Sequence, residues 1–96
     1  MVVVVWETWL RAGDEAEGLS LTREIWSDMQ HVDGYVSHQL LVDQDTPTHL
    51  LLVSRWHSRE AADRIKAEYV SEALRKLRPL LARERGRWVC SEDGHS

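Results

Sequence analysis

The chain has 96 residues and a mass of 11.2 kDa, the size of one small domain, which excludes a second domain. Its hydrophobic fraction of 43% and charged fraction of 29% are typical of a folded globular chain and exclude a disordered one. Acidic side chains outnumber basic ones by 16 to 12, so the formal charge of −4 argues against nucleic acid as a partner.

Cysteine usage and hydropathy bear on the compartment. Cys90 is the single cysteine of the sequence, so no internal disulfide can form, which favours a reducing, cytoplasmic compartment. The apolar run Val2–Val5 is soon followed by Glu7 and is too short for a secretory signal or a membrane span. We therefore expect no membrane partner.

The first half of the chain begins with a strand and a helix. The β-branched and aromatic side chains of residues 2–10 predict a strand. Apolar residues recur at four-residue spacing in the next segment and predict a helix over about 14–30. Gly18 lowers helix propensity by about 1 kcal/mol relative to Ala, so a later start, nearer Ser20, is the alternative.

A hairpin is predicted next. Residues 35–43 and 48–57 have strand-like patterns, and the turn residues between them indicate antiparallel pairing. A symmetric loop would place His38 opposite Val53 and Tyr35 opposite Trp56.

The rest of the chain predicts helical segments and a last strand. Ser58 is a plausible helix N-cap, and a second helical segment is expected to restart at Ser71, with Pro79 bending or shortening it. Residues 87–92 predict the final strand, and residues 93–96 a frayed tail outside the single domain of residues 1–92.

The resulting order is β-α-β-β-α-β, the pattern of ferredoxin-like α+β folds, with a four-stranded antiparallel sheet and the helices on one face. Residues 2–5 and 50–53 are apolar at consecutive positions, hence on both faces of their strands. The face without helices therefore needs a cover, and the simplest is the identical sheet of a second chain in a two-fold homodimer.

The segment 55–61, Arg-Trp-His-Ser-Arg-Glu-Ala, contains a W-x-S-x-E-A run that crosses from the third strand into the second helical region. With this run and its order of elements, the chain resembles the antibiotic biosynthesis monooxygenase family over nearly its whole length. The resemblance implies a dimeric α/β barrel with a pocket between sheet and helices in each protomer. Members include oxygenases that act on aromatic quinols without metal or flavin, haem-degrading enzymes and quinol monooxygenases.

The haem-degrading branch carries an Asn, a Trp and a His at three places. The corresponding positions here hold Trp6, Ile65, and Leu74 or Arg75, so the resemblance to this branch argues against haem degradation. No His-x-x-x-His pair, Cys-x-x-Cys pair or glycine-rich phosphate loop occurs in the sequence. We expect neither a metal nor a cofactor.

Aromatic and polar residues on the predicted strands and helices are the candidates for a site. His38 is the candidate base for a phenolic proton, and Arg55 the candidate stabiliser of a developing oxyanion. The pocket candidates are Trp6, Trp26, Trp56, Tyr69 and Arg75. For each tryptophan, the competing interpretation is packing in the core. For His38 and Arg55, the competing interpretation is a position at a sheet edge or in an interface hydrogen bond.

These residues favour a cofactor-independent monooxygenase of a small aromatic or quinol-like substrate. Two alternatives use the same pocket: a dimer that binds a small aromatic ligand without catalysis, and an isomerase or lyase of the same fold. Oxygen dependence separates the first interpretation from both alternatives.

Overall fold

The computed structural model describes residues 1–68 and 71–94, with four strands and three α-helices assigned within them. Residues 95 and 96, the end of the predicted tail, lie outside the described residues. The elements in chain order are β1 Val2–Trp9, α1 Glu15–Met29, β2 Tyr35–Val42, β3 His49–Trp56, α2 Arg59–Glu68, α3 Glu72–Leu77, a 3₁₀ turn Arg78–Leu80 and β4 Gly86–Ser91. This is the predicted ferredoxin-like α+β order, with the second helical region divided into α2 and α3.

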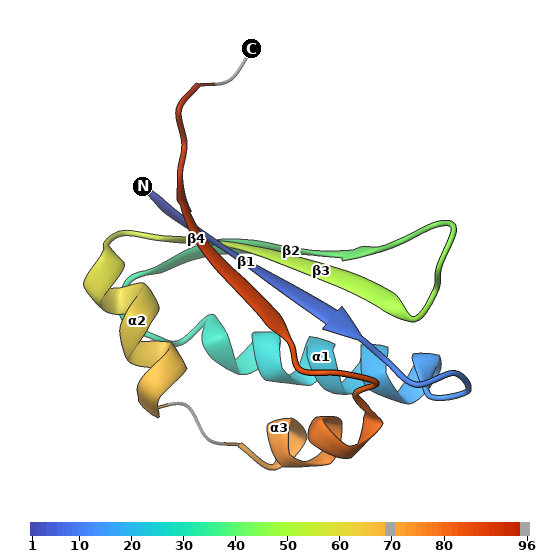
Figure 1. Cartoon of the computed structure of the whole chain (residues 1–96). Coiled ribbons are helices and arrows are strands. Elements are labelled where there is room, and N and C mark those ends of the chain that lie inside the picture. Colours follow the sequence, from blue (N-terminus) through green and yellow to red (C-terminus); the bar gives the residue numbers. More distant parts are fainter. Residues whose placement is uncertain (69–70, 95–96) are drawn as a thin grey trace.

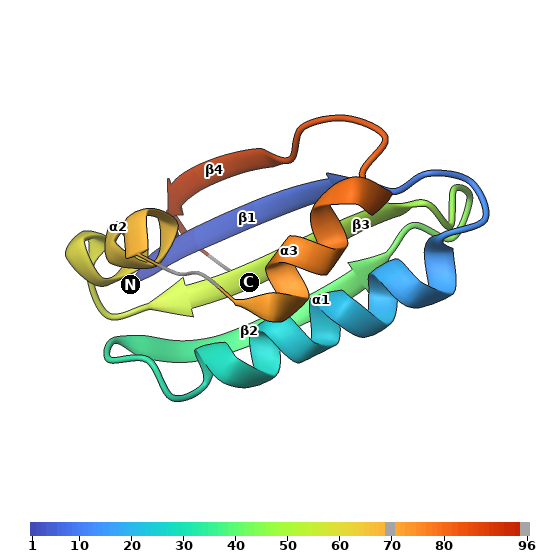
Figure 2. The same ribbon diagram turned by 90° about the horizontal axis from the view of Figure 1, so that it is seen from below.

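The four strands form one antiparallel sheet in the order β2-β3-β1-β4. The helices α1, α2 and α3 all lie on one face of this sheet, and no helix or strand of the described residues covers the opposite face (Figures 1 and 2). None of the helices among the described residues is long and apolar enough to cross a membrane.

The core lies between the sheet and the helices. Along β3, Leu50, Leu52, Ser54 and Trp56 alternate with less buried neighbours and point toward the helices. Leu50, Leu52 and Trp56 belong to one hydrophobic cluster with the apolar faces of α1 and α3. Burial of that cluster is the main stabilising term of the protomer.

Helix α1 begins at Glu15, which confirms the predicted helix over about 14–30, and the alternative of a later start near Ser20 is wrong. Gly18 is buried where α1 crosses the end of β1, and a Cβ atom there would lie 2.5 Å from the Leu10 methyl carbons. The glycine is required for close packing, and this tertiary contact outweighs its low helix propensity.

Helix α3 restarts where the sequence predicts. Ser71 is its N-cap and accepts a hydrogen bond from the Leu74 amide at 3.1 Å. Pro79 lies in the 3₁₀ turn that follows, where the missing amide hydrogen does not interrupt an α-helix.

The hairpin register differs from the symmetric prediction by a bulge. Tyr35 pairs with Trp56 as predicted, but His38 pairs with Ser54 and not with Val53, because the register shifts between Tyr35 and Ser37. The extra residue changes the alternation of side chains and places Tyr35 and His38 on the same face of β2. Their side chains then meet in a hydrogen bond of 2.5 Å between Tyr35 Oη and His38 Nδ1.

The face without helices, here called the outer face, is apolar at its centre. Val5 of β1 and Val53 of β3 are paired there, and the next outward residue of β3, Leu51, pairs with Leu41 of β2. Trp88 of β4 pairs with Val5 and is 51% exposed, and Leu41 is 44% exposed. These five side chains form an exposed patch of the kind that marks interaction surfaces.

One end of the outer face carries a charged cluster around His49. The Nε2 atom of His49 lies 2.7 Å from Glu7 Oε2, and its Nδ1 atom lies 2.9 Å from Asp43 Oδ2. The Trp9 ring stacks on the imidazole with centroids 3.9 Å apart. The Asp43 hydrogen bond, helped by Glu7, raises the pKa of His49, and the same bond lowers the pKa of Asp43.

We expect the His49→Gln variant to lose stability most strongly in mildly acidic solution. Because the pKa of His49 is raised on folding, its contribution is complete below its ordinary value of 6.5 and is lost as the pH rises through the folded-state pKa. Because the pKa of Asp43 is lowered, its contribution is complete above 3.8 and is lost at lower pH. The contributions of His49 and Asp43 are therefore both complete near pH 5, between 3.8 and 6.5.

Urea denaturation of wild type and variant at pH 5 and pH 9 measures this difference, with His31→Gln, an exposed histidine of the α1–β2 connection, as the control. We expect a clear loss for His49→Gln at pH 5 that shrinks at pH 9. A loss that is equal at both values, or larger at pH 9, would contradict this assignment.

Candidate functional site

A cavity of about 90 Å³ lies between the sheet and the helices. Strand β1 contributes Trp6 to its wall, and α1 contributes Trp26 with Ile25 and Met29. Ile65 of α2 and Leu74 of α3 complete the apolar lining, and Arg78 and Arg85 provide its charged part. The lining is thus aromatic and aliphatic, with two cations at one end.

An open groove of about 450 Å³ adjoins this cavity. Its lining residues are Trp6, Arg78, Leu81, Glu84, Arg85 and Arg87. Trp6, Arg78 and Arg85 belong to both hollows, so the cavity and the groove meet at these three side chains. The segment between α3 and β4 forms most of the groove.

The volumes of the cavity and the groove indicate which part of a ligand each of them could hold. An apolar cavity of about 150 Å³ is known to accept benzene, so 90 Å³ holds less than a whole ring in this conformation. Ligand sites for small molecules are usually about 300 to 1,000 Å³, and the groove is of that size. An aromatic ligand that used both hollows would place a ring edge against Trp6 and extend into the groove.

The mouth of the cavity has an aromatic ring between guanidinium groups. The Arg85 guanidinium carbon lies 4.6 Å from the Trp6 ring centroid, and that of Arg87 lies 5.5 Å from it. Burial, with a further contribution from the charge of Arg78, lowers the pKa of Arg85. The positive charges of Arg78, Arg85 and Arg87 therefore make the mouth of the cavity electropositive.

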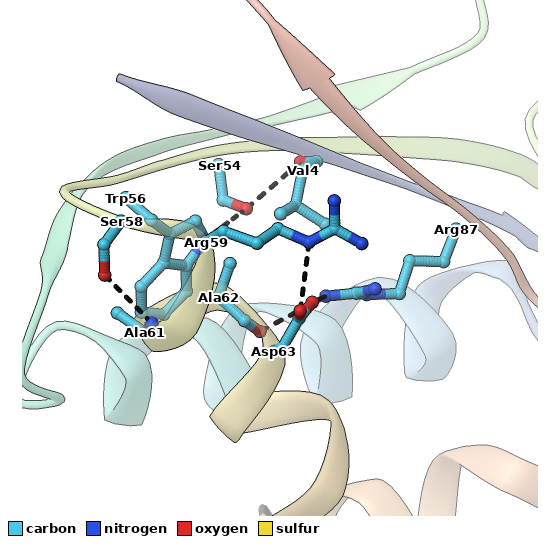
Figure 3. Close-up of polar contacts among 9 residues, drawn as sticks. All are labelled: Val4, Ser54, Trp56, Ser58, Arg59, Ala61, Ala62, Asp63 and Arg87. Carbon is cyan, nitrogen blue, oxygen red and sulfur yellow. Dashed lines mark hydrogen bonds and ion pairs between the residues drawn. The ribbon is translucent and has the colours of Figure 1, made fainter.

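Arg87 also connects β4 to helix α2. Its Nη2 atom donates to the Ala62 carbonyl at 3.2 Å and to Asp63 Oδ1 at 3.3 Å, while Arg59 Nε donates to the same carboxylate group at 3.0 Å (Figure 3). Its Nε atom is buried and has no hydrogen-bond partner among the described residues. Arg87 is thus anchored on the helix side and holds one wall of the groove.

Trp56 is 2% exposed and packs against the wall of the cavity. Its Nε1 atom donates to Ser54 Oγ at 3.0 Å, and Ser54 Oγ donates to the Val4 carbonyl at 3.1 Å (Figure 3). The Trp56 ring meets the Trp26 ring edge to face, with centroids 6.5 Å apart. This chain of contacts fixes Trp26 in the cavity wall, although Trp56 itself is not among the lining residues.

His38 lies behind Trp26 and does not line the cavity or the groove. It is on the helix side of β2, with its ring centroid 5.5 Å from that of Trp26 and its Nδ1 atom bonded to Tyr35 Oη. Burial lowers the pKa of His38, which favours the neutral imidazole. A neutral imidazole is the form that can accept a proton.

The remaining candidates from the sequence lie apart. Arg55 points to the outer face of the sheet, away from the cavity, and its Nε donates to Glu92 Oε1 at 3.0 Å. Arg75 is exposed on α3 and pairs with Glu72 at 2.8 Å. Tyr69 lies outside the described residues. Of the predicted set, the structure therefore brings Trp6 and Trp26 together in the cavity wall.

Sequence reasoning missed the two arginines at the junction of the hollows. Arg78 stands at the end of a basic run that reads as a solvated helix face, and Arg85 lies in a connection without periodicity. The usable signal was the position of Arg85, immediately before β4, the strand that pairs with β1 and Trp6.

A family model, antibiotic biosynthesis monooxygenase, matches residues 1–67 of the chain. No curated protein matches this chain. Among solved structures, a putative antibiotic biosynthesis monooxygenase from Nitrosomonas europaea is 17% identical with a TM-score of 0.84, and the alignment covers 98% of this chain and 100% of that one.

Two further structures are similar in fold. Rv0793 from Mycobacterium tuberculosis is 22% identical with a TM-score of 0.79, and the alignment covers 99% of this chain and 97% of that one. SnoaB, a cofactor-independent oxygenase from Streptomyces nogalater, is 22% identical with a TM-score of 0.75, covering 95% of this chain and 93% of that one.

Proposed function

The chain belongs to the antibiotic biosynthesis monooxygenase family, and we propose that it oxygenates a small aromatic or quinol-like substrate without a metal or flavin. The observation that carries this proposal is the cavity between sheet and helices, walled by Trp6 and Trp26 and open to an electropositive groove. A flat, electron-rich ring fits such a wall. The fold is shared with a cofactor-independent oxygenase, SnoaB, which supports the same reaction class.

The reaction needs only the substrate and dioxygen. A phenolate donates electron density to dioxygen at the ring carbon para to its oxygen, and a C–O bond forms to give a hydroperoxide. That carbon then loses its proton while the O–O bond breaks, which leaves a quinone carbonyl and releases one water molecule. One oxygen atom of O₂ enters the product, the other becomes water, and the substrate is the reductant.

The residues at the junction supply charge and shape. The positive charge of Arg78 and Arg85 at the junction favours the anionic form of the substrate, so the role that the sequence assigned to Arg55 passes in this proposal to the cations that line the cavity. Trp6 and Trp26 hold the ring and exclude water. His38 stays the proposed base, and because Trp26 lies between it and the cavity, proton transfer requires a movement of that indole or a water bridge.

We expect the purified protein to consume oxygen with 1-naphthol, whose ring carbon para to the hydroxyl carries a hydrogen, at one O₂ per quinone formed, in the presence of a chelator. With ¹⁸O₂, one labelled atom should appear in the product.

Trp6→Ala should lower kcat/KM at least about tenfold, because it removes the wall shared by cavity and groove. His38→Ala should lower kcat and shift the acidic limb of its pH profile.

Arg23→Gln is the control for this experiment, because Arg23 is exposed on α1 and lines neither hollow. Ligand binding without oxygen uptake would contradict the oxygenase and favour a binding protein. Product formation without oxygen would favour an isomerase or lyase. An unchanged rate in His38→Ala would remove the proposed base.

We also propose that two copies of the chain pair through their outer faces, as proteins of this family typically do. Val5, Val53, Leu51, Leu41 and Trp88 provide the apolar contact. Sedimentation at micromolar concentration should give a mass about twice 11.2 kDa.

Val53→Glu should shift the protein to the monomer, because a carboxylate at the centre of the patch would lose its hydration on pairing. Ala16→Glu, which adds the same charge to an exposed position of α1, should leave the dimer intact. A monomeric wild type, or a Val53→Glu variant that stays dimeric, would contradict the outer-face interface.

A further inference from the structure

Cations outnumber anions at the groove beside the cavity. Arg78, Arg85 and Arg87 line it together with a single carboxylate, that of Glu84. Asp63 pairs with Arg87 from α2 at 3.3 Å, which compensates that charge. Among the described residues, the side chains of Arg78 and Arg85 form no ion pair and no hydrogen bond, although the whole chain carries a formal charge of −4. Two guanidinium groups therefore remain without an anion.

Arg85 is the more confined of the two. It is half-buried, packs on the Trp6 ring at 4.6 Å, and has Arg78 as a like-charged neighbour. Removal of a charge from water is costly unless an opposite charge or hydrogen bonds compensate it. The Trp6 ring face gives only part of that compensation. An anion bound at this place would provide the rest.

Arg78 and Arg85 lie at the junction between the cavity, which could hold the ring edge of a ligand, and the groove, which could hold the rest. Arg78 and Arg85 belong to the lining of both hollows, so they lie where a ring in the cavity would project its substituent into the groove. A guanidinium offers a planar fork of N–H donors that fits the two oxygens of a carboxylate.

We propose that the groove recognises a carboxylate carried by the aromatic ligand, which is held by Arg85 and Arg78 while the ring lies against Trp6. This deepens the proposed function, on which it rests, by naming the substrate class as an aromatic acid. A monoanion suits the groove better than a phosphate monoester, because Glu84 also faces it and would repel a second negative charge.

Calorimetric titration with unreactive ligands tests the carboxylate site separately from catalysis. We expect 2-naphthoate to bind wild type at least about tenfold more tightly than 2-naphthamide, its neutral counterpart of the same shape, since hydrogen bonds to charged groups are among the stronger ones. Arg85→Gln should abolish this preference, and Arg85→Lys, which keeps the charge without the fork, should retain only part of it.

Arg23→Gln, which removes the same charge from α1 outside both hollows, should keep the full preference. Arg78→Gln is a second variant on an exposed position of the 3₁₀ turn, and it should reduce the preference at least about threefold even if Arg85→Gln fails to fold.

The possible results are distinguishable. Equal affinity for naphthoate and naphthamide would overturn the carboxylate site but leave the aromatic pocket standing. Tighter binding of 2-naphthyl phosphate than of 2-naphthoate would overturn the assignment of a monoanion. Binding of none of the three would overturn the carboxylate site and the aromatic pocket together. Naphthoate binding without any oxygen uptake in the naphthol assay would uphold the site and contradict only the oxygenase.

Discussion

The alternation of side chains on β1 and β3, the two central strands, is the constraint on which the rest of the structure depends. Their antiparallel register pairs Trp6 with Leu52 on the helix side and Val5 with Val53 on the outer face. One face thus builds the core and the cavity, and the other presents an apolar surface. Because a shift of one residue would exchange the two faces, this register positions both the proposed site and the proposed interface.

The electrostatic character of the site follows from the chain segment that closes it. Between the 3₁₀ turn and β4 the chain crosses beside Trp6 and places Arg85 there, while Arg87 reaches from β4 to α2. The anchoring of Arg87 by Asp63 uses its charge for structure, whereas Arg78 and Arg85 have no such partner among the described residues. An acidic protein therefore concentrates positive charge where its cavity opens.

Much of the fold could be predicted from the sequence, because strand patterns, turn residues and caps are local signals. Features that depend on tertiary contact could not: local patterns do not show that Gly18 packs on Leu10 within α1, or that a bulge in β2 changes the partner of His38. For the site, the tryptophans Trp6 and Trp26 follow from their elements. Arg85 was missed because an aperiodic connection does not reveal which side chain turns inward.

The most direct test of the cavity as the ligand site is the response of the indole N–H signals to 2-naphthoate in a ¹⁵N-correlated NMR spectrum, assigned with single Trp→Phe variants. The tryptophans lie on both faces of the sheet and report on each. We predict large shifts for Trp6 and Trp26, which line the cavity, and little change for Trp9 and Trp88 on the outer face. Shifts confined to Trp9 or Trp88 would contradict this prediction.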